Sequence, residues 1–428
     1  MDHSGNIYIN EAQKIISLLK KDFILANGAL CINRHYDYKS PYHALPDLGD
    51  IVPFLIYFKE FDLVEAQIEA LKKNLVRGIL ISELPAFHIK HLAKSYEYSD
   101  LLLGLLDYHL YKNDEASRRL LFTIADKAIE IFNFSGSFNS FYWPTWNLHF
   151  PIKDSRDGMM IELFNELHSL SQDKKYLDVA YNIYQQLVKT NFYQQHHIFP
   201  TFSTNSILPK FSSKFSQGKI GKANTNTLFA LLSLWVKTKD QNILEIIIQT
   251  VEAIRIKVMS KGGVGEVFNP KNKNFKICLT PSFALLDFLC DFYYYHKRVE
   301  TIDLAKSIAH YWLDRQAKSG LFPLYDQGQE DFLDSETDMS VALYKLYELT
   351  REEKYKNSAD ACLAGIIKMH GSQNYVMGVD IDNGQVLNPG QKSKFLTLFL
   401  KLLILKLESD KGKKIYVDQE LFNLLKDR

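Results

Sequence analysis

The chain has 428 residues, of which 46% are hydrophobic and 24% charged, and its formal net charge is +1. This length is sufficient for a large core, and we expect residues 1–428 to form a single domain. The balanced charge gives no bulk attraction to nucleic acid or to an acidic membrane, so we expect neither as a partner.

The termini and cysteines set further limits. The first residues lack the charged start, apolar core and small-residue cleavage site of a signal peptide. The longest apolar stretch, 395–407, is interrupted by Lys401 and is too short to span a bilayer. No CxxC pair occurs among the four cysteines, so we expect neither a disulfide nor a zinc site. We therefore expect a cytoplasmic protein without a cofactor, either a monomer or a homodimer.

Helical periodicity dominates the chain, and two kinds of helix alternate. Amphipathic helices with one charged face are predicted at 10–24, 62–76, 114–132, 174–190, 240–258, 299–318 and 353–368. Between them lie segments that are apolar on nearly every side, at 51–58, 101–110, 159–170, 226–236, 282–295, 339–349 and 395–405. A helix that is apolar all round must be buried all round, so the second kind is the inner one. The pair recurs roughly every 45 to 60 residues, as in helix-pair repeats.

The connections alternate as well. Links from an inner to an outer helix are short, whereas links from an outer to an inner helix are long and rich in aromatics. This alternation predicts that all long links lie on one face, and long links in a compact domain are usually functional. Turn signals at Gly262-Gly263 and Asn383-Gly384 predict short β-hairpins within them.

An open solenoid and a closed ring both fit this repeat. The inner segments are too apolar for the wet concave face of a solenoid, so they favour a ring. The phrase "DMSVALYKLYELTREEKYKNSADA" resembles the (α/α) toroids of carbohydrate-active enzymes, as does its parallel "DGMMIELFNELHSLSQDKKYLDVAYNI". That group includes six- and seven-hairpin glycosidases, unsaturated glucuronyl hydrolases and sugar 2-epimerases. The resemblance implies an all-α toroid of six or seven hairpins and an active face on the long-link side, but no single family motif matches.

The residues at the start of each inner helix are then the candidates for a site. Catalysis is predicted for Asp157, Glu336 and Asp338, and substrate binding for Asp50, Trp143, Trp146, Arg156, Asn224 and Lys392. Glycoside cleavage needs one protonated and one ionised carboxyl group, and neighbouring acids separate their pKa values in this way. Aromatic side chains can stack on sugar faces. Acids at helix starts are also ordinary caps, which is the plain alternative.

Within this set, Asp338 aligns with Asp157 in the repeat, so we expect these two to face each other. The acid-rich start "EDFLDSETDMS" is expected to use Asp334 as the helix cap and to direct Glu336 or Asp338 inward. Lys210, Lys214, Lys219 and Lys222 occur without an acid between them, and with Arg156, Lys392 and Lys394 they would give a positive bowl suited to an acidic sugar. A solvated loop is the plain alternative.

His88 and His91 are three residues apart, but no third ligand has matching spacing, so no metal site is expected. The leading hypothesis is a glycoside hydrolase acting on an oligosaccharide or polysaccharide. The alternatives are a sugar or uronate epimerase on the same fold, in which His or Tyr moves a carbon-bound proton, and a non-catalytic helical protein that binds a glycan or a protein partner.

Overall fold

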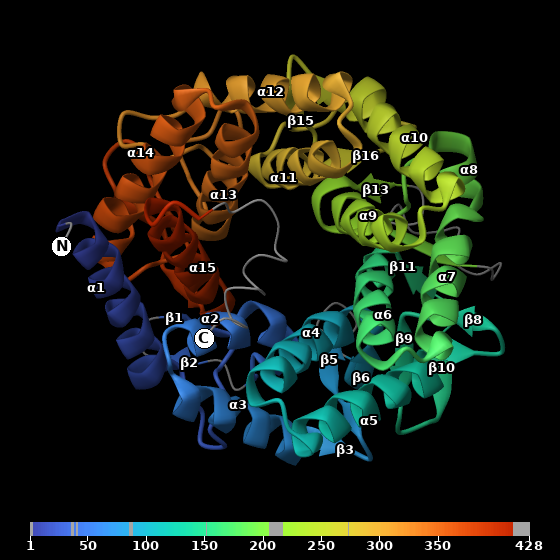
Figure 1. The fold of residues 1–428 in the computed structure, drawn as a ribbon. Helices are drawn as coiled ribbons and strands as arrows, with labels where there is room; N and C mark the ends of the chain where they lie inside the picture. The colour runs from blue at the N-terminus through green and yellow to red at the C-terminus, as the bar shows by residue number, and fades with distance from the viewer. Residues whose placement is uncertain are drawn as a thin grey trace.

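The computed structural model describes residues 3–35, 38–39, 42–84, 89–150, 152–204, 217–272 and 274–413. Its helices form two concentric layers around a common axis, as Figure 1 shows. In the described part of the chain, seven helices form the inner layer: α2 (Val52–Tyr57), α4 (Ser95–Lys112), α6 (Gly158–Ser171), α9 (Asn226–Thr238), α11 (Leu279–His296), α13 (Leu333–Thr350) and α15 (Ser393–Asp410).

Seven outer helices of the same described ranges cover them: α1 (His3–Leu18), α3 (Phe61–Asn74), α5 (Glu115–Phe132), α7 (Lys174–Val188), α10 (Gln241–Val258), α12 (Val299–Leu313) and α14 (Glu353–Met369). Each inner helix packs on the next one, and α15 packs on α2, so the ring closes. The all-α toroid predicted from the sequence is confirmed, and of the six or seven hairpins expected the structure has seven among the described residues. Among the helices described, none is both long and apolar enough to cross a membrane.

The boundaries differ from the predicted ones mainly at the N-terminus. The first outer helix begins at His3 rather than at residue 10, and it continues into the π-helical turn Leu19–Phe23. The acid-rich helix α13 begins at Leu333 after a Phe332 N-cap that makes no side-chain cap bond. Asp334 therefore lies within the first turn, and its predicted role as the cap is wrong.

The short links share one backbone feature. In six short links of the described chain, a residue just after the inner helix has a left-handed backbone conformation. These residues are Lys59, Asn113, Gln172, Lys239, Lys297 and Arg351. A left-handed residue lets the chain reverse and start the outer helix within two or three residues. None of the six is a glycine, although glycine adopts this conformation at the lowest cost.

Replacing Lys59 with Gly is expected to stabilise the protein by about 0.5–1 kcal/mol, because Lys59 is exposed and has a φ of 61°. The midpoint of urea unfolding would rise. The matched control is Lys73→Gly in the last turn of α3, which should cost about 1 kcal/mol because its helical backbone gains nothing from glycine. Equal destabilisation by both changes would contradict this account.

All strands of the described residues lie in the long links. They are β1 (Asn33–His35), β2 (Tyr38–Lys39), β3 (Leu75–Val76), β4 (Ile79–Leu80), β5 (Ser82–Leu84), β6 (Ile89–Lys94), β7 (Asn133–Phe134), β8 (Ser137–Phe138), β9 (Phe141–Trp143), β10 (Leu148–Phe150), β11 (Ile152–Asp154), β12 (Phe202–Thr204), β13 (Gly218–Lys219), β14 (Met259–Ser260), β15 (Gly263–Val264), β16 (Val267–Phe268), β17 (Gly378–Val379), β18 (Val386–Asn388) and β19 (Gly390–Lys392). The hairpins predicted from Gly262-Gly263 and Asn383-Gly384 are the β14–β15 and β17–β18 pairs.

Strand pairing joins successive long links to one another. β1 pairs with β19, β6 with β9, β11 with β12, and β13 with β16, all antiparallel. Single bridges from Cys278 to Tyr325 and from Glu330 to Asp380 join the remaining C-terminal links. Because these pairings connect neighbouring links, the long links all lie on the same face of the ring, as predicted.

Candidate functional site at the ring centre

Each inner helix is covered by its two neighbours and by the outer layer, which leaves one side directed at the ring centre. On that side a stripe of half-buried residues follows the helical repeat. The stripes comprise Glu97, Asp100 and Leu103 on α4; Met159, Glu162 and Glu166 on α6; Asn226, Phe229 and Ser233 on α9; Thr280, Phe283 and Asp287 on α11; Asp334 and Asp338 on α13; and Lys394 and Lys401 on α15. Carboxyl groups are the most frequent members of this set.

Four of these side chains and one from the neighbouring 3-10 helix Leu45–Asp50 form what we call the Asp338 cluster: Asp50, Asp287, Asp334, Asp338 and Lys401. Burial raises the pKa of Asp338 to about 8, with further increases from Asp334, Asp287 and Asp50 and an opposing effect from Lys401. Asp338 is therefore mainly protonated at neutral pH, and its neighbours come from four elements of the ring. Such a carboxyl group is suited to donate a proton.

A second group, the mouth cluster, consists of Asp47, Asp50, Asp100 and Lys394. The Lys394 ammonium contacts Asp50 and lies 3.5 Å from Asp47 and 3.4 Å from Asp100. Burial alone would lower the pKa of Lys394, but the three carboxyl groups together raise it well above its usual value. Burial raises the pKa of Asp100 to about 7, against the effect of Lys394. Asp50 belongs to both clusters and so connects them.

A close helix contact brings the mouth cluster together. A Cβ atom placed on Gly104 of α4 would lie 2.4 Å from the carbonyl carbon of Leu48. Only a glycine allows α4 to approach the 3-10 helix Leu45–Asp50 so closely. This approach sets Asp100 beside Asp47 and Asp50.

Asp157, predicted to be catalytic, lies apart from these clusters. Its two carboxyl oxygens accept hydrogen bonds from the Ser95 hydroxyl and, at 2.6 Å, from the Ser140 hydroxyl, and only 2% of the residue is exposed. Burial, followed by the charge of Asp154, raises its pKa to about 7. The charges that act on Asp338 come from Lys401, Asp334, Asp287 and Asp50, and these surroundings lend no support to the expected pairing of Asp338 with Asp157. The contacts indicate that Asp157 joins the starts of α4 and α6.

Glu336 is fully buried and points in the other direction from Asp338. Its carboxyl group accepts the Phe322 backbone N–H at 2.7 Å and contacts the Cys362 thiol of the outer helix α14 at 2.8 Å. Burial, followed by the charge of Asp331, raises its pKa well above the usual value. Residues two apart on a helix face nearly opposite sides, whereas Asp334 and Asp338, four apart, share one. The structure thus places Asp338, and not Glu336, towards the ring centre.

Two residues predicted to bind substrate, Arg156 and Asn224, make their polar contacts with other residues of this chain instead. Arg156 makes a charged pair with the buried Asp154 and stacks on the Tyr96 ring at 3.6 Å. Asn224 is fully buried, accepts the Phe199 N–H at 2.7 Å and donates to the Phe199 and Lys219 carbonyls. Both side chains hold long links in place.

The predicted aromatic residues lie at the rim. Trp143 and Trp146 belong to the β9–β10 hairpin, and 71% of Trp146 is exposed. Their rings are 6.4 Å apart and nearly perpendicular, and Trp143 stacks on Phe150. Figure 1 shows the hairpin over the wall of α5, α6 and α7, away from the ring centre. The structure does not bring these residues together with the Asp338 cluster.

The basic residues that were expected to give the ring centre a positive lining do not do so in the described part of the chain. Lys394 is surrounded by three carboxyl groups, Arg156 is paired with Asp154, and the Lys392 ammonium lies over the Phe395 ring at 4.7 Å. Lys219 is exposed. Lys210, Lys214 and His88, and the side chains of Lys222 and His91, lie outside the described residues. The charges at the ring centre are mainly negative because acids outnumber lysines on the inner-helix stripes.

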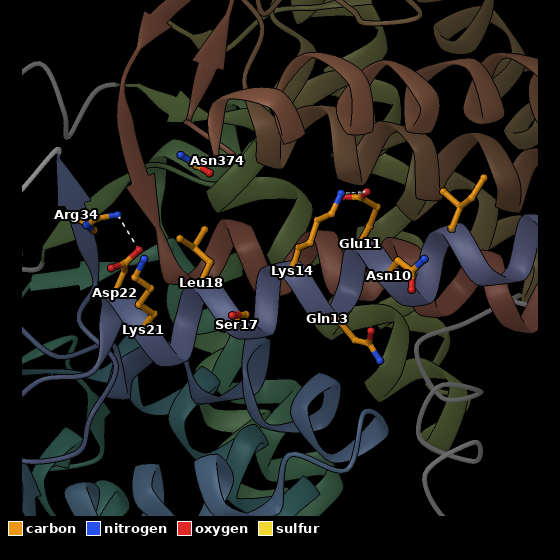
Figure 2. A pocket seen from close by; sticks show the side chains of 11 residues that line it. Asn10, Glu11, Gln13, Lys14, Ser17, Leu18, Lys21, Asp22, Arg34 and Asn374 are labelled. Carbon is orange, nitrogen blue, oxygen red and sulfur yellow. Dashed lines mark hydrogen bonds and ion pairs between the residues drawn. The ribbon is translucent and has the colours of Figure 1, made fainter.

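A groove of about 920 Å³ lies elsewhere, along the outer face of α1 (Figure 2). Four of its five charged residues form pairs, Lys14 with Glu11 and Arg34 with Asp22, and the fifth is Lys21. The remaining lining is mostly amide and hydroxyl groups without an aromatic residue. We place the candidate site at the ring centre because acids with raised pKa values converge there and not in this groove.

Sequence reasoning missed Asp287, Lys345 and Lys401, which lie deeper in the inner helices. Their signal was present, since each is a charged residue within an otherwise apolar inner segment. Within the described ranges, no group of three or more His, Cys, Asp or Glu side chains is arranged to hold a metal ion.

Comparisons with solved structures place this ring among known folds. The α-1,2-mannosidase from Trichoderma reesei matches with a TM-score of 0.70 at 12% identity, over 94% of this chain and 93% of that one. A D-mannose isomerase matches at 0.61 and 10% identity, over 94% and 97%. Cellobiose 2-epimerase from Bacillus thermoamylovorans matches at 0.60 and 12% identity, over 94% and 100%. The chain has the (α/α)-toroid fold of carbohydrate-active enzymes. No family model matches the sequence, and a search of curated proteins found no match.

Proposed function

We propose that this protein is a carbohydrate-active enzyme that hydrolyses glycosidic bonds at the ring centre, with Asp338 as the proton donor. The observation that carries the proposal is the Asp338 cluster, in which a half-buried carboxyl group with a raised pKa lies among other carboxyl groups. Hydrolysis of a glycoside requires a protonated and an ionised carboxyl group side by side. The fold shared with a mannosidase supports the same reading.

The charge at the ring centre bears on the substrate. Because the described stripes carry more carboxylates than lysines, an anionic sugar would be repelled. We therefore propose a neutral oligosaccharide or polysaccharide in place of the acidic sugar considered from the sequence. The test is product chromatography after incubation with neutral, amino and uronic acid oligosaccharides. Cleavage of a neutral member is the expected result, and cleavage confined to uronic acid members would refute the charge argument.

Epimerisation is the second candidate, because two of the matched structures are a sugar epimerase and an isomerase. That chemistry removes a carbon-bound proton, typically with a His or Tyr. None of the described half-buried positions on the inner-helix stripes is a His. Incubation in D₂O separates the candidates: an epimerase incorporates deuterium at carbon without cleaving the sugar, and a hydrolase cleaves it without such incorporation.

The exposed Trp146 is proposed to contact the glycan at the rim. Replacing Trp146 with Ala should weaken binding of a long neutral oligosaccharide by roughly 2- to 12-fold, the range expected for about 0.5–1.5 kcal/mol of aromatic stacking. Calorimetric titration of the two proteins gives the comparison. The control Ile256→Ala removes a side chain of similar exposure, 65%, from the outer wall and should leave affinity unchanged. Unchanged affinity in both variants would remove Trp146 from the site.

A further inference from the structure

A buried lysine joins two inner helices below the Asp338 cluster. The Nζ atom of Lys345 on α13 lies 2.7 Å from Asp287 Oδ1 and 3.1 Å from Asp291 Oδ2, both on α11. Only 3% of the Lys345 side chain and 4% of the Asp291 side chain are exposed, whereas 22% of the Asp287 side chain is exposed. One ammonium group therefore compensates two carboxylates, of which one is enclosed and the other is accessible.

The helix geometry places Asp287 between Lys345 and Asp338. Lys345 follows Asp338 by seven residues, which puts both on one side of α13 with about 10 Å of helix rise between them. Side chains on a helix lean towards its N-terminus, so Lys345 extends back towards the long-link face. The negative charge of Asp287 contributes to the raised pKa of Asp338, and the two carboxyl groups lie on α11 and α13, which pack directly on each other.

The charged groups around this space come from four elements. They are Asp50 of the 3-10 helix Leu45–Asp50, Asp287 and Asp291 of α11, Asp334, Asp338 and Lys345 of α13, and Lys401 of α15. Two of the partly exposed carboxylates have an ammonium group in direct contact, Asp287 with Lys345 and Asp50 with Lys394. Asp50 shares its lysine with Asp47 and Asp100 in the mouth cluster, whereas Asp287 lies on α11, which packs directly on α13. Asp338 differs from Asp287 in its surroundings, because burial and then the neighbouring carboxyl groups raise the pKa of Asp338 to about 8.

We propose that Asp287 is the second reacting carboxyl group of this site, and that Lys345 is the positioning residue that holds Asp287 directed at the ring centre. This assignment rests on the proposed hydrolytic function. In the reaction, Asp338 gives its proton to the glycosidic oxygen as the bond from that oxygen to the anomeric carbon breaks. A water oxygen bonds to the anomeric carbon, and Asp287 accepts a proton from that water. Exchange with solvent then returns Asp287 to its ionised form and Asp338 to its protonated form.

The test measures kcat and KM against pH for the wild type and for Asp287→Asn, Lys345→Met and Lys345→Met/Asp291→Asn, on the neutral oligosaccharide that the wild type cleaves. The double variant removes the enclosed carboxylate that would otherwise lose its counter-charge, so a folded protein without Lys345 is obtained even if the single variant unfolds. The matched control is Lys406→Met, because Lys406 is likewise buried between two carboxylates, Asp360 at 3.0 Å and Asp410 at 2.9 Å, on the outer side of α15.

Asp287→Asn is expected to lower kcat by about 100-fold or more with little change in KM. Loss of Lys345 should lower kcat by about 10-fold or more with little change in KM, because Asp287 loses the contact that directs it at the ring centre. Lys406→Met should lower the melting temperature without changing kcat.

Two different results would overturn the inference and are distinguishable. If the wild type cleaves a glycan but Asp287→Asn keeps most of its kcat, or the profiles of both Lys345 variants superimpose on that of the wild type, the assignment is wrong and the hydrolytic function stands. If the wild type cleaves no glycan, the proposed function fails and the assignment fails with it.

Discussion

Asp338→Asn is expected to lower kcat by about 100-fold or more while the protein melts at nearly the wild-type temperature. An amide of the same shape keeps the packing but has no proton to give at neutral pH. Asp338 is half-buried among other acids. Replacing its carboxyl group with an amide of the same size therefore opens no cavity. Steady-state kinetics and a thermal melt on the same preparation provide the comparison.

The pH dependence follows from the raised pKa of Asp338, about 8. A proton donor is active in its protonated form, so kcat should be retained below pH 8 and fall as the pH rises through that value. Asp334→Asn is the matched control, because it removes one of the charges that raise the pKa of Asp338. It should move this basic limb to lower pH without abolishing activity. Two results together would exclude Asp338 as the donor: Asp338→Asn remains active, and the basic limb of the kcat profile does not move in Asp334→Asn.

His370→Ala is expected to cost about 3–5 kcal/mol of unfolding free energy. His370 and Asp331 are fully buried, with His370 Nε2 2.5 Å from Asp331 Oδ2. The Val376 carbonyl, 2.9 Å from His370 Nδ1, can only accept a hydrogen bond, so Nδ1 carries a proton. Removing the imidazole leaves Asp331 Oδ2 buried without its partner, while Oδ1 still accepts the Val379 N–H at 2.7 Å.

Urea unfolding gives the comparison for this pair. The control His168→Ala removes a half-buried histidine that also contacts a backbone carbonyl, that of Asp173, and should cost less than about 1 kcal/mol. In the double variant His370→Ala/Asp331→Ala no buried carboxylate is left over, so its loss should be smaller than the sum of the two single losses. A loss below 1 kcal/mol for His370→Ala would show that this pair does not stabilise the ring.

The fold was predictable because its signals are local and repeated. Helices such as α11 and α15 are apolar on nearly all sides, and this requires neighbours on all sides. The alternation of short and long links then fixes which face carries the strands. The number of hairpins was open in the sequence because the short helix α2, Val52–Tyr57, is a weak member of the repeat.

The site was predictable only in part. Asp50 and Asp338 were found because they stand near the starts of inner helices. Aligning the repeats paired Asp157 with Asp338, but the two residues stand at different positions relative to their helices. The helix α6 begins directly after Asp157, whereas α13 begins five residues before Asp338. The half-buried Glu162 of α6 is the residue at a similar depth. The direction of Glu336 depends on where α13 begins and which side meets α14, and neither follows from a list of acids.

The most direct test of the central claim, that the ring centre hydrolyses a glycan with Asp338 as the donor, is product analysis in H₂¹⁸O. Wild-type protein and Asp338→Asn are incubated with the same neutral oligosaccharide, and the masses of the products are measured by mass spectrometry. The account predicts one ¹⁸O atom in the new reducing end for each bond that the wild type cleaves, and at least about 100-fold slower incorporation with Asp338→Asn. Equal rates of incorporation by the two proteins, or no incorporation by the wild type, would contradict it.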